Sequence, residues 1–231
     1  MFLRVVLPEH HLSADSKDTV RMGFGLIGTM TALVLGLLIA SAKSFYDTQS
    51  NELTEMSAKV VLLDRVLAHY GPETKEVRDL LHSAVARMLD QLWPKDPGQH
   101  PQMEPTAAGG EILYDKIQEL SPKNDTQRSL QAQALNMAID LGKMRWLMFE
   151  QGGSFISMPI MAMLVFWLAI IFSSFGLFAP RNATAIATLF VCALSVSGAI
   201  FLILEMYTPF RGITRISSKP MKEALDQISL K

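Results

Sequence analysis

Cysteine and net charge are both nearly absent from this chain of 231 residues. Cys192 has no second cysteine to pair with, so no disulfide framework can hold the fold. The 21 lysines and arginines are balanced by 22 aspartates and glutamates, which leaves a formal net charge of −1. That balance excludes the strongly basic character that recruits nucleic acid, so we expect no nucleic-acid partner.

Catalytic motifs are missing as well. The chain contains no GxSxG, HExxH, P-loop or dinucleotide fingerprint, so we expect no enzyme, no catalytic residue and no cofactor. Glu9, His10, His11 and Asp15 gather near the start, but adjacent histidines do not share a helix face and their spacing fits no standard metal site. The sequence therefore predicts no metal site.

Ionisable side chains are absent from Met22 to Ala42. At about 1.5 Å per residue, a helix of this length crosses a hydrocarbon core of roughly 30 Å, so we predict a first transmembrane helix over residues 22–44. Small residues recur at every fourth position of this helix, namely at Gly28, Ala32, Gly36 and Ala40. In lipid such a face lets a second backbone approach closely, so we expect this helix to assemble copies of the chain.

Residues 1–21 are predicted to be a polar juxtamembrane leader. A competing interpretation is a cleaved signal peptide, because Ala40-Ser41-Ala42 imitates a signal-peptidase site. The apolar run is too long and the polar lead too extended for a typical signal, so we favour a retained span.

Residues 45–154 are predicted to be a helical domain. The apolar side chains after Asp47 are separated alternately by three and four residues, which indicates that the first span continues as a long helix. Gly71-Pro72 should end this helix. Further helices are expected near 73–93, 111–120 and 125–151, with a mobile loop over 94–109 that is rich in proline and glycine.

Two further apolar runs predict transmembrane helices over residues 155–178 and 183–205, joined by a short polar turn. Residues 206–231 should form a tail that contains a short amphipathic helix. The fold class is therefore an all-α integral membrane protein in which a helical domain separates the first span from the second.

Basic residues near the ends of the spans predict the orientation. A cytoplasmic domain and C terminus would place most of them inside, in line with the positive-inside rule. Three spans would then leave the N terminus outside, which is unusual for a short polar leader and suggests a missing helix.

Charged residues at the span ends are candidates for a pore mouth or a latch. Glu205 ends the third apolar run, where a carboxylate is costly unless it is paired or hydrated. It either pairs locally with Arg211 or Arg215, or it belongs to a charged ring or latch with Lys43. Lys43 and Asp47 are spaced i,i+4, so they form either a surface pair or, in a symmetric oligomer, charged rings.

Four segments together resemble a bacterial membrane family catalogued as bestrophin-like. These segments are LPEHHLS, GLIGTMTALVLGLLIASAKSFYD, VVLLDRVLAHYGPE and TPFRGITRISSKP, and they follow the family order over nearly the whole chain. Members usually carry one more N-terminal span, so the resemblance implies either an internal start at Met1 or a three-span variant. With that span restored, both termini would be cytoplasmic.

Bestrophins are pentameric ion channels whose pore is lined by the span before the cytoplasmic domain. By this analogy we expect a homo-oligomer, a pentamer, in the bacterial inner membrane that conducts inorganic ions. Its conduit would be lined by Gly28, Thr29, Ala32, Gly36, Ala40 and Ser41. The alternative is a non-conducting scaffold or accessory subunit that binds a partner through its cytoplasmic helices.

Overall fold

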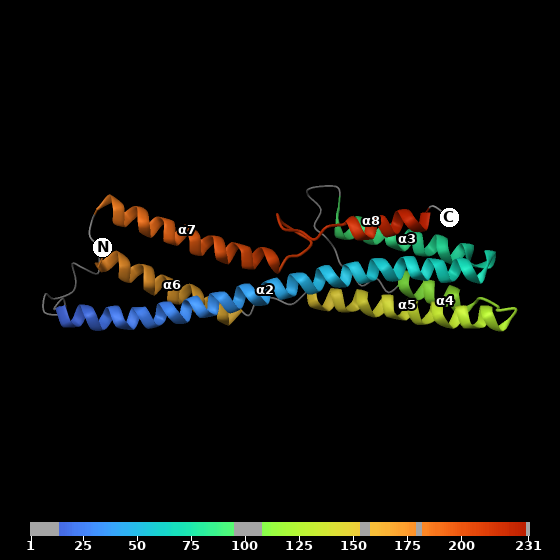
Figure 1. The fold of residues 1–231 in the computed structure, drawn as a ribbon, viewed down its shortest axis with the longest axis horizontal. Helices are drawn as coiled ribbons and strands as arrows, with labels where there is room; N and C mark the ends of the chain where they lie inside the picture. Colours follow the sequence, from blue (N-terminus) through green and yellow to red (C-terminus); the bar gives the residue numbers. More distant parts are fainter. Residues whose placement is uncertain (1–13, 95–107, 153–157, 179–181, 230–231) are drawn as a thin grey trace. The chain divides into compact units, whose positions relative to one another are not determined.

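The computed structural model describes residues 14–94, 108–152, 158–178 and 182–229, and these residues form helices joined by short turns, without a β-strand among them. The all-α prediction is therefore confirmed. The elements, in chain order, are α2 (Ala14–Tyr70), the 3₁₀ turn η2 (Pro72–Thr74), α3 (Lys75–Leu92), α4 (Ala108–Gln118), α5 (Asp125–Gly152), α6 (Met158–Phe178), α7 (Ala183–Met206) and α8 (Lys219–Ser229) (Figure 1).

The chain forms two compact units. The first comprises residues 1–45 and 155–207, and the second comprises residues 46–154 and 208–231. Helix α2 has 57 residues and passes from the first unit into the second without interruption. The predicted continuation of the first span as a long helix is therefore correct.

The first unit is built on three helices that are long and apolar enough to cross a membrane. They are the N-terminal part of α2, most of α6 and the whole of α7. Most of their large apolar side chains are exposed, as expected for helices that face lipid. Helix α7 is capped by Asn182, whose side-chain oxygen accepts a hydrogen bond of 2.8 Å from the backbone N–H of Ala185. This chain is a membrane protein.

The second unit has a conventional apolar core. The residues of α2 that recur at three- and four-residue spacing after Asp47 are all buried, and apolar side chains from the other helices of this unit join them. The buried residues of α2 are Leu53, Met56, Val60, Leu63, Leu67 and Tyr70. Their spacing is thus accounted for by packing within one chain.

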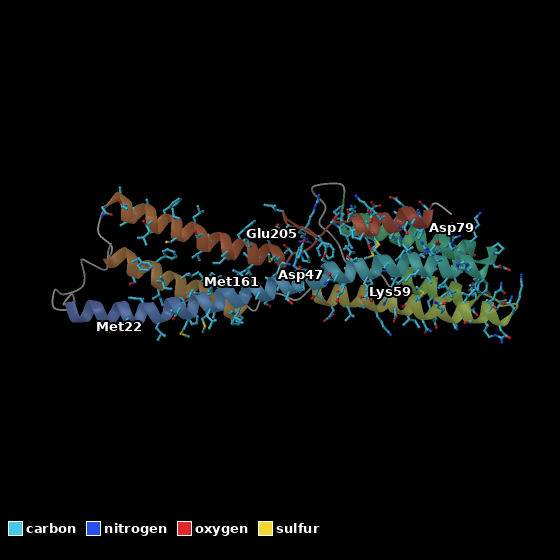
Figure 2. The ribbon with its side chains drawn as sticks, viewed as in Figure 1. Met22, Asp47, Lys59, Asp79, Met161 and Glu205 are labelled. Atoms are coloured by element: carbon cyan, nitrogen blue, oxygen red, sulfur yellow. The ribbon has the colours of Figure 1, made fainter. Side chains whose placement is uncertain are left out.

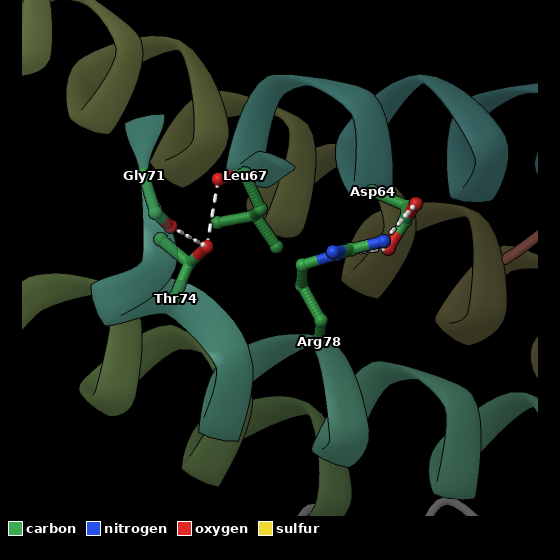
Figure 3. Close-up of polar contacts among 5 residues, drawn as sticks. All are labelled: Asp64, Leu67, Gly71, Thr74 and Arg78. Carbon is green, nitrogen blue, oxygen red and sulfur yellow. Dashed lines mark hydrogen bonds and ion pairs between the residues drawn. The ribbon is translucent and has the colours of Figure 1, made fainter. Parts of the chain in front are cut away.

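The C-terminal end of α2 is a sharp stop. Gly71 has a φ of 138°, which residues with a side chain rarely adopt, and Pro72 follows it. The Thr74 hydroxyl lies 2.7 Å from the carbonyl oxygen of Leu67 and 2.8 Å from that of Gly71, so it satisfies carbonyls that the ending helix leaves open (Figure 3). The predicted stop at Gly71-Pro72 is confirmed.

Helix α8 and the segment before it pack within the second unit. Met221, Ala224 and Ile228 share one buried face, which confirms the expected amphipathic tail helix. The indole N–H of Trp93, just after α3, donates a 2.9 Å hydrogen bond to the carbonyl of Ile216. The same ring meets Phe210 edge to face, with the ring centroids 5.6 Å apart. The tail is therefore tied to α3.

Candidate conducting face of α2

Helix α2 has a packed side and an open side within the first unit. Thr31 and Ala42 are buried, while Ala32, Gly36 and Ala40 are exposed. At about 100° per residue, Thr31 and Ala42 lie about 120–140° around the helix from Gly36. The small side chains are thus on the side that the chain's own helices leave uncovered.

Gly36 on this side and the half-buried Gly28, about 80° around the helix from it, both have room for a Cβ. Among the described residues, a Cβ added at Gly28 or at Gly36 would find no non-neighbouring heavy atom within 4 Å. Glycine is therefore not required at either position by packing inside one chain.

The candidate hydroxyls differ in position. Thr29 is exposed on the side of Gly36 and donates a 2.8 Å hydrogen bond to the carbonyl of Leu26, so its oxygen can still accept a hydrogen bond. Ser41 lies about 140° around the helix from Gly36. Its hydroxyl is 3.2 Å from the Tyr207 hydroxyl, and the Tyr207 ring stacks on Phe45 with centroids 5.4 Å apart. Ser41 thus joins α2 to the end of α7.

The charged candidates fall into two groups. Lys43 and Asp47 follow Gly36 by seven and eleven residues, which returns both to within about 20° of its direction. Glu205 is half-buried in the last turn of α7 (Figure 2). Arg211 and Arg215 are exposed in the segment that follows α7.

A buried ion pair in the second unit escaped the sequence-based prediction. Asp64 on α2 and Arg78 on α3 form two parallel contacts (Figure 3). The available signal was an acidic residue directly after buried Leu63 and three residues before buried Leu67. A charge so close to a core stripe indicates a partner on a neighbouring helix.

An open groove of about 410 Å³ lies between α2 and α8. Ala58, Val61 and Leu62 line its α2 side, and Arg65 and Glu223 place opposite charges at it. Leu62 is exposed although most other large apolar residues of α2 in this unit are buried. The groove is an apolar surface on the second unit.

The part of the chain that the structure describes contains no cluster of three or more His, Cys, Asp or Glu side chains that could hold a metal ion. The histidines at positions 10 and 11 lie outside the described residues.

Comparison with known proteins agrees with this architecture. The family model described as a Bestrophin-like domain matches residues 1–221. A variant of a bacterial bestrophin homologue from Klebsiella pneumoniae is similar in structure, with a TM-score of 0.69 and 14% identity over 90% of this chain and 85% of that one. A zinc-phased structure of a bacterial bestrophin homologue from the same organism has a TM-score of 0.67 and 15% sequence identity, over 90% of this chain and 87% of that one.

A third structure, described as a membrane protein, has a TM-score of 0.68 and 14% identity over 98% of this chain and 95% of that one. A comparison with curated proteins found no match. At these identities the structural similarity shows the fold, and the family model shows the family.

Proposed function

Because the chain belongs to the bestrophin-like family, we propose that it forms an ion channel whose constriction is lined by the small-residue side of α2. The channel is a homo-oligomer in the bacterial inner membrane, a pentamer by analogy with bestrophins, and its permeants are inorganic ions. The observation that carries the proposal is that Gly36, Ala32 and Ala40 are exposed, on a side of α2 that none of the other described helices covers.

The chemistry of this side suits a narrow conduit. Apolar helices do not need small residues to face lipid, but close approach of copies around an axis does need them. Ala32, Gly36 and Ala40 leave space along such an axis, and the Thr29 oxygen offers an acceptor to a passing cation. Lys43 and Asp47 would recur once per copy as charged rings at the end of the same line.

The distribution of basic residues supports a cytoplasmic second unit. Arg211, Arg215, Lys219 and Lys222 follow the last span, and Lys143 and Arg145 precede the second, so most basic residues near span ends belong to this side. The half-buried Glu205 then lies at the cytoplasmic end of α7, where it contributes charge to the pore mouth together with Arg211 and Arg215.

The groove between α2 and α8 favours the second candidate function, a non-conducting scaffold that binds a partner through its cytoplasmic helices. Leu62 and its apolar neighbours offer that partner a surface, and Arg65 and Glu223 supply charges of both signs.

Gly36→Leu separates the two functions, because a Cβ at this position meets no atom of the described residues within 4 Å. Gly198→Leu on α7 is the matched control, since a Cβ there is equally free of contacts. Each protein is purified for particle imaging without imposed symmetry, and is reconstituted in liposomes for potassium and chloride flux. We expect a closed ring with the α2 helices around its axis, flux in the parent and in Gly198→Leu, and loss of most of that flux in Gly36→Leu.

A monomer, or a dimer without an axis, would contradict the channel and leave the scaffold. A ring whose flux is unchanged by Gly36→Leu would place the constriction elsewhere than on this side of α2.

A further inference from the structure

The second unit exposes large apolar side chains at the two places where the chain connects to the last two membrane helices. Trp146, near the end of α5, is 54% exposed, and Leu147 beside it is also exposed. Ile213, shortly after α7, is 83% exposed. Leu62, Ile112 and Ile139 are exposed elsewhere on the second unit, so exposure alone does not mark a site. Neighbouring exposed apolar side chains beside a membrane helix are candidates for contact with an apolar environment outside the chain.

Both places lie close to membrane helices along the chain. Five residues separate Gly152, the last residue of α5, from Met158, the first residue of α6. Such a linker keeps these two helix ends within about 20 Å of each other. Ile213 follows Met206, the last residue of α7, by seven residues.

The exposed ring on α5 has a defined orientation. Trp146 meets Phe149 edge to face, with centroids 6.1 Å apart and an interplanar angle of 88°. Tryptophan combines an apolar body with an N–H donor, and it is enriched where hydrocarbon meets headgroups.

Basic side chains accompany the apolar ones at both places. Lys143 is exposed and Arg145 is half-buried just before Trp146, and Arg211 and Arg215 lie on either side of Ile213. Burial, and then repulsion from the nearby Arg87, lower the pKa of Arg145. An anion bound beside Arg145 would favour its charged form and so act against both effects.

We propose that these two segments, Lys143–Phe149 and Arg211–Arg215, bind anionic phospholipids at the membrane surface. The lysine and the arginines contact the headgroup phosphates, and Trp146, Leu147 and Ile213 enter the boundary between headgroups and acyl chains. The partner is lipid rather than another protein because each segment combines cationic and apolar side chains next to a membrane helix. The binding does not depend on conduction and would hold for a scaffold as well.

Tryptophan fluorescence in nanodiscs tests the apolar part. A full-length variant that keeps Trp146 alone, through Trp93→Phe and Trp167→Phe, reports on the α5 segment only, because Trp93→Phe removes a tail contact next to Arg211–Arg215. It is placed in phosphatidylglycerol or phosphatidylcholine with brominated acyl chains. We expect stronger quenching of Trp146 in phosphatidylglycerol. A variant that keeps Trp93 alone is the control, since that side chain packs inside the second unit, and it should be quenched little in either lipid. Quenching of Trp146 no stronger than that of Trp93, as when a second copy covers it, would overturn the proposal.

Native mass spectrometry tests the cationic part without altering any tryptophan. Substitution of Lys143, Arg145, Arg211 and Arg215 by Gln should lower retention of phosphatidylglycerol about tenfold or more. The control carries Lys75→Gln and Lys222→Gln, which remove exposed lysines elsewhere on the second unit. Equal retention by both proteins would overturn the proposal. Displacement of the lipid by inorganic phosphate would reveal a site for free anions and would also overturn it.

Discussion

Asp64 and Arg78 hold α2 and α3 together through a two-point ion pair. Arg78 Nε lies 2.7 Å from Asp64 Oδ1, and the Nη2 atom of the same guanidinium lies 3.0 Å from Oδ2 (Figure 3). The Asp64 side chain is only 5% exposed and that of Arg78 is 21% exposed. The hydrogen bonds to Asp64 raise the pKa of Arg78. The planar fork fixes both the distance and the rotation of α3 relative to α2.

Removal of the arginine should cost more stability than removal of the aspartate. Arg78→Met leaves a buried carboxylate without its counter-charge, so we expect a loss of about 3 kcal/mol. Asp64→Leu should cost less, because the partly exposed guanidinium can reach water. The double variant should be more stable than Arg78→Met alone. Apparent thermal unfolding in one detergent measures the stability of all three variants. A double variant as unstable as Arg78→Met would show that lost geometry, rather than an unpaired charge, causes the destabilisation.

Gly71→Ala should destabilise the end of α2. The φ of 138° disfavours any side chain, and the added Cβ would lie 2.6 Å from Glu73 Oε2. We expect a loss of about 1–3 kcal/mol in the free energy of unfolding. The matched control is Gly142→Ala within α5, where a Cβ meets nothing and alanine should add up to about 1 kcal/mol. Effects of the same sign in the two variants would contradict the role assigned to Gly71.

The contact between Glu73 and Lys123 should make stability depend on pH. Lys123 Nζ lies 2.6 Å from Glu73 Oε1, and this hydrogen bond lowers the pKa of Glu73 below its ordinary 4.5. A lowered pKa means that the contribution is present above pH 4.5 and is lost as the pH falls through the folded-state pKa. Lys123→Met should therefore lower the apparent Tm slightly at pH 7, and this effect should shrink as the pH falls below 4.5. The exposed Lys222→Met serves as control, and a difference that does not shrink with falling pH would rule out this pair as its source.

Trp93→Phe should loosen the tail. The variant loses the 2.9 Å hydrogen bond to the carbonyl of Ile216, which corresponds to about 1 kcal/mol, together with part of the contact with Phe210. We expect faster amide hydrogen exchange over residues 209–229, whereas α5 and α6 keep their exchange rates. Trp167→Phe in α6 is the control and should leave the tail unchanged. Equal exchange in the two variants would mean that Trp93 does not hold the tail.

Periodicity was sufficient to predict the helices, their stops and the buried stripe of the second unit. The spacing of apolar residues distinguishes a helix from a strand. A Gly-Pro pair such as Gly71-Pro72 usually ends a helix. Helix bounds moved by a few residues: α4 begins at Ala108 rather than near Glu111. The start of the span predicted at 155 and most of the loop predicted at 94–109 lie outside the described residues.

Side-chain partners across helices were beyond the sequence. The pairing of Asp64 with Arg78 and the contact of Ser41 with Tyr207 depend on how helices rotate against each other, which local spacing does not determine. The small-residue pattern could be read from the sequence, yet only the structure shows that the chain's own helices leave it uncovered. The bestrophin-like family was predicted from sequence segments and is confirmed by the family model.

The uninterrupted course of α2 places two different apolar surfaces on one backbone. Its apolar residues face outward at Leu26, Leu33 and Leu37 and inward at Leu53, Leu63 and Leu67, on one continuous backbone. Insertion of one residue between Leu53 and Leu63 would turn Leu53 by about 100° around the helix axis relative to Leu63 and would break the buried stripe of the second unit, whereas insertion of seven would turn it by only about 20°. Length changes within this stripe are therefore best tolerated when they are close to whole helical turns, such as about 7, 11 or 18 residues.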